Sequence, residues 1–343
     1  MRVLKFLGNS KTAMADIPVP KPDKGQVLVK VMVSALCGSE RPDYLNPNPG
    51  DEFAGQEAGH EFAGQVVEAN ETCNIKVGDR VTINVVQGCG ECYYCKKSVF
   101  QMCKKMRIWC GGHGEYAVVP ETSCIKLPDD LDYDTGVMIG GDTLGVASRA
   151  YASLPNGIGR IALVIGSGPI GLGVTSVLKY AGYHVVVSEL GEFRRKFAIS
   201  AAGADAALDP KTDDVAAHLM KITCGMGPDV AVDCSGKEDA ETFALDIVRP
   251  QGNVVFCGEN GRGLNINPSR QLLHREVTLK GIFYYTRENF VDLQEMYKRG
   301  LRVNELVSHR FMFDRAEEAA HTFFSEKAGK VLIYRYEKEG VMK

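Results

Sequence analysis

Residues 161–171 read IALVIGSGPIG, an apolar run of five residues followed by a glycine-rich turn. A helical pattern over residues 171–180 and a second apolar run, His184–Ser188, come directly after the turn. Strand, turn and helix in this order, with fully apolar strands, predict a parallel sheet covered by helices on both faces. Further apolar runs at 229–233, 253–257 and 277–282 continue the pattern, so we assign this α/β domain to residues 151–285.

The first 150 residues have a different pattern. β-rich runs at 27–33, 62–68 and 79–86 are separated by Gly, Pro and Asn, which predicts a barrel-like or partly open all-β unit. The chain has 343 residues, and single hydrophobic cores stop growing at roughly 250–300 residues, so two domains are expected. Near the end, a helix at 317–324 and a strand at Lys330–Tyr334 form a tail that we expect to pack back on the first domain.

Composition favours small-molecule chemistry. The net charge is −3, 45% of the residues are hydrophobic, and neither sign of charge forms a long block. No basic face therefore suggests a nucleic acid, and no polybasic segment suggests an anionic membrane. No run has the length of a signal peptide or approaches the ~20 apolar residues of a membrane span, so we expect a cytoplasmic protein.

The glycine-rich turn predicts a dinucleotide site. Gly166 permits the tight turn, Gly168 lets the backbone approach a pyrophosphate, and Gly171 allows close packing of helix and strand. The phosphates would lie at the helix N-terminus, beside Pro169 and Ile170. The alternative is a glycine-rich turn in an α/β domain that binds no nucleotide.

Glu189 follows the second strand, 18 residues after Gly171, where a carboxylate can accept hydrogen bonds from the adenosine ribose. Its charge would repel a 2′-phosphate, so NAD is favoured over NADP. Arg194 and Arg195 weaken this preference, because a nearby guanidinium could offset the repulsion. We include Arg194 among the candidate cofactor contacts.

Four of the eleven cysteines lie within fifteen positions, at Cys89, Cys92, Cys95 and Cys103. Four thiolates at such spacing suit a tetrahedral Zn²⁺, and four protein ligands leave no position for substrate. The predicted zinc is therefore structural. An iron–sulfur cluster is the chemical rival, and a set of buried cysteines without metal is the other alternative.

Cys37 and His60 are weaker signals. A thiolate and an imidazole are zinc ligands, and a catalytic zinc has three protein ligands and one open position. Taken alone, however, Cys37 could be a small buried residue and His60 a core histidine with satisfied hydrogen bonds.

Several motifs together resemble the zinc-containing medium-chain dehydrogenase/reductase family over essentially the whole chain. They are Cys37-Gly38-Ser39, Gly59-His60-Glu61, Val77-Gly78-Asp79-Arg80-Val81, the four-cysteine lobe, the turn at 166–171 and Ser308-His309-Arg310-Phe311. The resemblance implies a GroES-like catalytic β-domain at 1–150, with the structural zinc lobe at 89–103. It implies an inserted Rossmann doubly wound parallel sheet at 151–285 and a segment at 286–343 that returns to the catalytic domain.

The resemblance also implies a catalytic zinc on Cys37 and His60 at the interdomain cleft, with Glu61 close behind or exchanging as a ligand. Ungapped comparison with members that resemble threonine dehydrogenases places Asp142 at the third ligand position. A slip of one residue would place Gly141 there and leave Glu61 as the substitute ligand. A solvated carboxylate at a helix start is the alternative interpretation of Asp142.

Ser39 matches the hydroxyl that, in this family, hydrogen-bonds the zinc-bound alcohol and passes its proton outward. Many relatives complete the relay with a histidine five positions after the cysteine, but here that position is Pro42. The loop at 44–50 also differs from the usual substrate-pocket loop. We leave Trp109 and His113 outside the predicted site, as a packing residue and a loop residue.

These observations predict an NAD-dependent dehydrogenase of a secondary alcohol in a polyol, sugar or cyclitol, with two zinc ions per chain. A threonine-type amino-alcohol dehydrogenase is the second enzyme hypothesis. A noncatalytic nucleotide-binding protein with only structural zinc is the third. The resemblance implies a homodimer or homotetramer.

Overall fold

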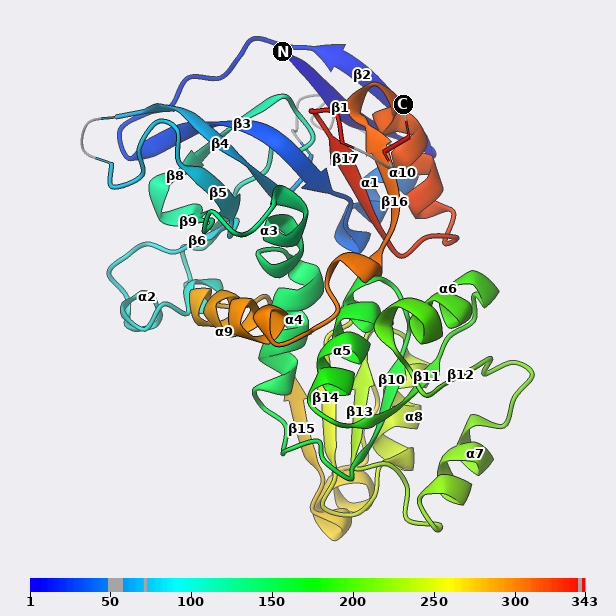
Figure 1. The fold of residues 1–343 in the computed structure, drawn as a ribbon. Coiled ribbons are helices and arrows are strands. Elements are labelled where there is room, and N and C mark those ends of the chain that lie inside the picture. Colours follow the sequence, from blue (N-terminus) through cyan, green and yellow to red (C-terminus); the bar gives the residue numbers. More distant parts are fainter. Residues whose placement is uncertain (49–57, 71–72, 339–340, 343) are drawn as a thin grey trace. The chain divides into compact units, whose positions relative to one another are not determined.

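A computed structural model describes residues 1–48, 58–70, 73–338 and 341–342 (Figure 1). The chain divides into two compact units. The first unit contains residues 1–142, 286–290 and 307–343, and the second contains residues 143–285 and 291–306. The expected boundary at 285 coincides with one of these limits, whereas the boundary expected at 150 lies at 142 and residues 291–306 also belong to the second unit.

Helix packing explains the difference in boundaries. A Cβ on Gly173 would lie 1.9 Å from the Thr143 carbonyl oxygen, so α4 (Asp142–Tyr151) packs tightly on α5 (Pro169–Tyr180). The Ser176 hydroxyl donates to the Arg302 carbonyl at 2.7 Å, which holds residues 291–306 against the same helix. Both segments therefore belong to the second unit.

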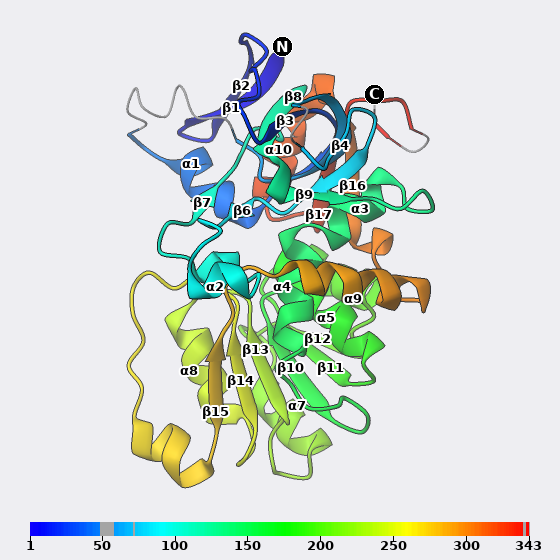
Figure 2. The same cartoon turned by 90° about the vertical axis from the view of Figure 1, so that its left-hand side faces the viewer.

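The second unit is built on a parallel sheet that, among the described residues, has six strands in the order β12-β11-β10-β13-β14-β15. Their bounds are Ile161–Ile165 (β10), His184–Ser188 (β11), Ala206–Leu208 (β12), Val230–Asp233 (β13), Asn253–Phe256 (β14) and Thr278–Gly281 (β15). Strand order reverses between β10 and β13, the place where sheets of this kind bind ligands. Figures 1 and 2 show α5 and α8 (Glu238–Ile247) on opposite faces of the sheet.

The predicted strands of this unit are present, most of them one or two residues shorter than expected. β12 was not predicted, because it has three half-buried residues and lacks the apolar run of its neighbours. The other helices here are α6 (Glu192–Phe197) and α7 (Val215–Ile222), and α9 (Arg287–Lys298) is shared by both units.

The first unit contains a sheet in the order β16-β17-β3-β4-β5-β9, with β8 also paired to β3. The strand bounds are Gln26–Ala35 (β3), Glu61–Ala69 (β4), Arg80–Ile83 (β5), Tyr116–Pro120 (β8), Cys124–Lys126 (β9), Val307–Met312 (β16) and Lys330–Tyr334 (β17). β3 and β4 are antiparallel, and Ala35 lies opposite Glu61. The end of β3 therefore lies beside the start of β4.

The predicted strand at 79–86 is interrupted. β5 ends at Ile83, and β6 (Val86–Gln87) pairs instead with β7 (Arg107–Ile108). Asn84 causes the break, because its side-chain oxygen accepts the Val86 N–H at 3.2 Å while its own N–H donates to Ser123.

The N-terminal hairpin of β1 (Arg2–Gly8) and β2 (Lys11–Asp16) was not predicted. Its turn residues Asn9 and Ser10 both have positive φ, at 50° and 59°. A turn of this kind usually has glycine at its second position, where this chain has serine. The short helices of this unit are α1 (Arg41–Leu45), α2 (Tyr93–Lys96) and α3 (Tyr133–Ile139). No helix in the described parts of the chain is long and apolar enough to cross a bilayer.

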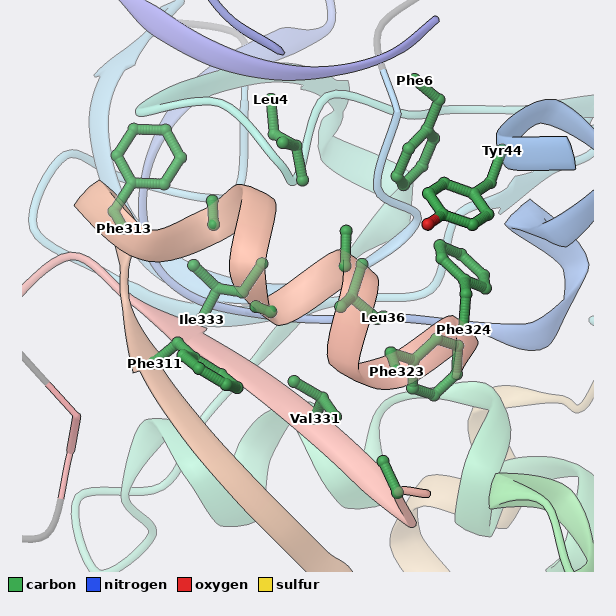
Figure 3. Close-up of a cluster of buried hydrophobic side chains, with 14 residues drawn as sticks. Leu4, Phe6, Leu36, Tyr44, Phe311, Phe313, Phe323, Phe324, Val331 and Ile333 are labelled. Atoms are coloured by element: carbon green, nitrogen blue, oxygen red, sulfur yellow. The ribbon is translucent and has the colours of Figure 1, made fainter. Parts of the chain in front are cut away.

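The C-terminal tail completes the core of the first unit. β17 pairs antiparallel with β3, and α10 (Ala316–Phe324) supplies aromatic side chains to a buried cluster (Figure 3). Tyr44 stacks on Phe324 with ring centroids 4.4 Å apart, and Phe6 meets Phe324 edge-on at 5.7 Å. Leu36, in the same cluster, immediately precedes Cys37.

Replacement of Phe311 by Ala tests this core. Phe311 is 1% exposed, and truncating a buried Phe costs about 3–5 kcal/mol. Trp109 is the only tryptophan and lies in the first unit, so its fluorescence during urea unfolding reports this unit. Val77→Ala, at a side chain 63% exposed, should change the free energy of unfolding by less than about 0.5 kcal/mol. Equal effects of the two substitutions would contradict the assigned core.

Candidate active site

Cys37 and His60 meet because of strand pairing. Cys37 comes two residues after the end of β3, and His60 comes one residue before β4 begins. Because these two ends are paired, residues 23 positions apart in sequence are brought together.

Asp142 reaches the same place through two glycines. A Cβ on Gly140 would lie 2.4 Å from the Thr82 hydroxyl, and one on Gly141 would lie 2.5 Å from Glu61 Oε2. The segment that follows α3 therefore passes directly over β4 and β5. Asp142, the first residue of α4, is thereby placed beside His60.

Cys37, His60, Glu61 and Asp142 are all buried, and each offers one ligand atom within 4.8 Å of the others. Asp142 Oδ2 lies 3.3 Å from His60 Nε2 and 3.9 Å from Cys37 Sγ. The Ser39 hydroxyl is 3.4 Å from His60 Nε2. Burial lowers the pKa of His60, but the Cys37 sulfur and Asp142 carboxylate outweigh it and raise the pKa well above its usual value.

Glu61 forms a buried ion pair that sequence analysis did not predict. Its Oε1 accepts from Lys330 Nζ at 2.6 Å, and both side chains are 1% exposed. Burial raises the pKa of Glu61, and the Lys330 charge opposes that rise. Glu61 Oε2 is buried and has no hydrogen-bond partner within the described residues. Lys330 lies 269 positions away in sequence, so no local pattern could reveal the pair.

This donor set fits a divalent cation. A thiol, an imidazole and a carboxylate converge, with an orphaned carboxylate oxygen of Glu61 close by. Three such ligands with a further open position are the arrangement of catalytic zinc sites. The Asp142 carboxylate lies between His60 and Cys37 in a buried place, and such a donor set suits a cation.

Trp109 and His113, which sequence analysis left outside the site, have different surroundings in the structure. Trp109 is half-buried, and its Nε1 donates to Gln87 Oε1 at 2.9 Å. His113 was expected to be a loop residue, but it is fully buried, 3.1 Å from the carboxylate of Glu40. Neither Glu40 nor His113 carries a spacing signal in the sequence.

The four-cysteine lobe brings its sulfurs together. Cys89 and Cys95 have their sulfurs 3.9 Å apart, and Cys92 and Cys95 have theirs 3.5 Å apart. Tetrahedral zinc with Zn–S bonds of ~2.3 Å requires sulfurs about 3.8 Å apart. The backbone N–H groups of Glu91 and Cys92 lower the pKa of Cys89 to about 6, and burial raises the pKa of Cys95 to about 12.

The glycine-rich turn of the second unit has glycines of two kinds. Gly166 has φ of +84°, and a Cβ on Gly171 would lie 1.9 Å from the Gly166 carbonyl oxygen, so the fold itself requires both. A Cβ on Gly168 would meet nothing within 4 Å, and its φ is −68°. Packing does not explain a glycine at position 168.

Glu189 is 9% exposed, and its carboxylate is tied to the turn. One oxygen accepts the Ser167 N–H and the other the Gly191 N–H, both at 2.7 Å. Arg195 pairs with Asp209 at 3.0 Å, while Arg194 lies half-buried on α6. Pro169 and Ile170 open α5 beside the turn.

Two family models match the chain. Residues 23–129 match the alcohol dehydrogenase GroES-like domain, and residues 169–299 match the zinc-binding dehydrogenase. The chain is 32% identical to the L-threonine 3-dehydrogenase of Pyrococcus furiosus over 335 residues, which cover 93% of this chain and 94% of that protein.

Solved structures agree with the sequence matches. The 2R,3R-butanediol dehydrogenase of Bacillus subtilis is similar with a TM-score of 0.83 at 29% identity, covering 98% of this chain and 99% of that one. An Escherichia coli alcohol dehydrogenase, described as short-chain and complexed with NADH, is similar with a TM-score of 0.85 at 25% identity. The match covers 97% of this chain and 99% of that one.

Similarity over nearly the full length places the protein among the dehydrogenases. The chain belongs to the zinc-containing medium-chain alcohol dehydrogenase family, and it is an oxidoreductase that acts on alcohols. The predicted fold, a GroES-like β-domain with an inserted Rossmann sheet, is confirmed.

Replacement of Lys330 by Met tests the buried ion pair. The Glu61 carboxylate would be left buried without a partner, and breaking such a pair costs about 3–5 kcal/mol. Urea unfolding followed by Trp109 fluorescence measures the loss. Adding Glu61→Gln to Lys330→Met should restore much of the stability, because the second charge is also removed.

Lys126→Met provides the matched control. Lys126 pairs with Asp79 at 2.7 Å, but its side chain is 54% exposed, so its loss should cost less than about 1 kcal/mol. An effect of Lys330→Met no larger than that of Lys126→Met would contradict the buried pair.

Proposed function

We propose that this protein transfers a hydride between NAD(H) and a secondary alcohol of a polyol, sugar or cyclitol, at a zinc ion held by Cys37, His60 and Asp142. The observation that carries the proposal is the convergence of these three buried donors, with Asp142 Oδ2 3.3 Å from His60 Nε2. A second zinc would be held by the lobe cysteines 89, 92, 95 and 103.

The position of Glu61 supports Asp142 as the third ligand. Lys330 holds one Glu61 oxygen at 2.6 Å, whereas Asp142 points an oxygen toward both Cys37 and His60. Glu61 then lies behind the site, and its unbonded Oε2 makes it available as an exchanging ligand.

The bound zinc would polarise the substrate hydroxyl and make it more acidic. The chain's own contribution to proton transfer is Ser39, whose hydroxyl lies 3.4 Å from His60 Nε2 and so beside the ligand cluster. Position 42 is a proline and has no side chain that can carry a proton onward. The proton that Ser39 accepts would leave through Asp43, through the cofactor ribose with water, or directly to solvent.

The preference for NAD is argued from Glu189. Two backbone N–H bonds hold its carboxylate at the end of β11, beside the dinucleotide turn. A carboxylate held there would accept hydrogen bonds from the ribose hydroxyls and repel a 2′-phosphate. Arg195, one of the two basic side chains that could offset the repulsion, already binds Asp209 and two backbone carbonyls.

The substrate class is argued from the relatives. L-Threonine and 2R,3R-butanediol both carry a secondary hydroxyl next to a carbon that bears a second polar group. A vicinal polyol, sugar or cyclitol has the same feature. An amino alcohol such as threonine is the second candidate, which the 32% identity to a threonine dehydrogenase favours. We propose a homodimer or homotetramer as the assembly.

Substrate assay and metal analysis test the proposal together. Purified protein should reduce NAD with one of a panel of polyols, sugars and cyclitols, with threonine assayed in parallel, and should contain two zinc ions per chain. Cys37→Ser should lower the zinc content to one per chain and reduce turnover at least ~100-fold, because a catalytic ligand is lost. Unchanged zinc content and turnover would contradict the catalytic assignment. Tight NAD binding without turnover of any alcohol would instead favour a noncatalytic nucleotide-binding protein.

Gly168→Ala tests the dinucleotide turn. The added Cβ has open space and an ordinary φ, so the melting temperature should stay within a few degrees of wild type. NADH affinity, measured by calorimetry, should fall at least ~10-fold, because the backbone can no longer approach the pyrophosphate. Gly171→Ala is the contrasting variant, since it should destabilise the second unit itself. Wild-type NADH affinity in Gly168→Ala would contradict the assigned binding turn.

A further inference from the structure

Glu40 is a buried carboxylate, 5% exposed, that touches the segments carrying both Cys37 and His60. Its Oε2 accepts the backbone N–H of Cys37 at 2.9 Å. Its Oε1 accepts the backbone N–H of Gly59, the residue before His60, at 3.0 Å. One side chain therefore joins the end of β3 to the approach to β4.

The backbone just before His60 is tightly confined, and Glu40 is one of the groups that hold it. Gly59 has φ of +91°, and a Cβ there would lie 2.4 Å from the backbone nitrogen of His113. Its carbonyl accepts from Gly112 at 2.8 Å, and the preceding carbonyl of Ala58 accepts from His113 at 3.1 Å. The Gly59 N–H faces Glu40, so the carboxylate sets where His60 stands relative to Cys37.

His113 holds Glu40 in place from the other side. Its Nε2 lies 3.1 Å from Glu40 Oε1 and 3.3 Å from Oε2, and its Nδ1 lies 3.2 Å from the Ser34 hydroxyl. Ser34 in turn accepts from the Arg335 guanidinium at 3.2 Å. These polar groups link the half-buried Arg335 guanidinium to the buried Glu40 carboxylate.

A carboxylate is the group that these contacts require. The two oxygens of Glu40 each accept one backbone N–H, from Cys37 and from Gly59, and both oxygens lie within 3.3 Å of His113 Nε2. An ionised carboxylate accepts hydrogen bonds at both oxygens, whereas an amide offers one accepting oxygen and one donating nitrogen. Glutamine at position 40 would therefore leave either the Cys37 or the Gly59 N–H without an acceptor.

We propose that Glu40, held by His113, is a positioning residue that fixes the separation of Cys37 and His60 and so keeps the metal ligands converged. This inference rests on the proposed function, since it assumes a metal on Cys37, His60 and Asp142. Residues that orient metal ligands typically contribute 10–100-fold to metal affinity. Loss of Glu40 should therefore act on this metal centre and leave the lobe zinc unchanged.

Zinc release measures this effect without relying on turnover. The holoenzyme is mixed with a chromogenic chelator, and the two zinc ions of each chain are released in separate phases. Cys37→Ser identifies the phase of the candidate active site, because that phase disappears. In Glu40→Gln, that phase should be about 10–100-fold faster than in wild type, with the lobe phase unchanged.

Three variants serve as comparisons. Glu121→Gln is the matched control, because Glu121 accepts the backbone N–H of Asn74 at 2.6 Å but no N–H of the ligand segments. It should release both zinc ions at wild-type rates. Glu40→Asp keeps the charge and should recover part of the retention lost in Glu40→Gln. His113→Phe removes the support of Glu40 without touching it, and it replaces Glu40→Gln if that protein fails to fold.

Cobalt provides a spectroscopic readout. After Co²⁺ replaces the active-site zinc, the visible bands report ligand geometry, and they should shift in Glu40→Gln and shift less in Glu40→Asp. Wild-type release and an unchanged cobalt spectrum in both Glu40→Gln and His113→Phe would overturn the inference. Equal acceleration of both zinc phases would also overturn it, because that result indicates general loosening of the unit. If the wild-type protein contains zinc only in the lobe, the proposed function itself fails, and the inference about Glu40 fails with it.

Discussion

The antiparallel pairing of β3 with β4 is the constraint on which the rest of the first unit depends. Ala35 lies opposite Glu61, so Cys37 leaves one strand where His60 enters the other. β17 pairs with the opposite edge of β3 and brings Lys330 to Glu61. A slip of one residue in the β3–β4 register would turn the side chains to the other face and disperse the cluster.

The same strand pairing gathers acidic and thiol groups in one buried place, so basic groups must lie near them. The cluster gathers Cys37, Glu61 and Asp142 in a buried environment, where unpaired charge is costly. Distant segments supply the opposite charges: the buried Lys330 pairs with Glu61, and the half-buried Arg335 is linked through Ser34 and His113 to Glu40. The Lys330 charge also acts on Cys37 and Asp142, and a metal ion held by Cys37, His60 and Asp142 would add further positive charge to the cluster.

The sequence predicts features that depend on neighbouring residues. β10, its glycine turn and α5 are marked by an apolar run and three glycines, and the four-cysteine lobe is marked by spacing alone. Lys330, Glu40 and His113 were missed because their partners lie far away in sequence, and a buried lysine has no distinct pattern. Asn84 shows a further limit, since one side-chain hydrogen bond ends a strand that β propensity would continue.

The most direct test of the account is a crystal structure of the purified protein with anomalous data collected at the zinc edge. We expect a peak about 2.0–2.3 Å from Cys37 Sγ, His60 Nε2 and an Asp142 oxygen, with Glu61 still paired to Lys330. A second peak is expected among the four lobe cysteines. A protein with zinc only in the lobe, or with Glu61 bound to zinc in place of Asp142, would contradict the account.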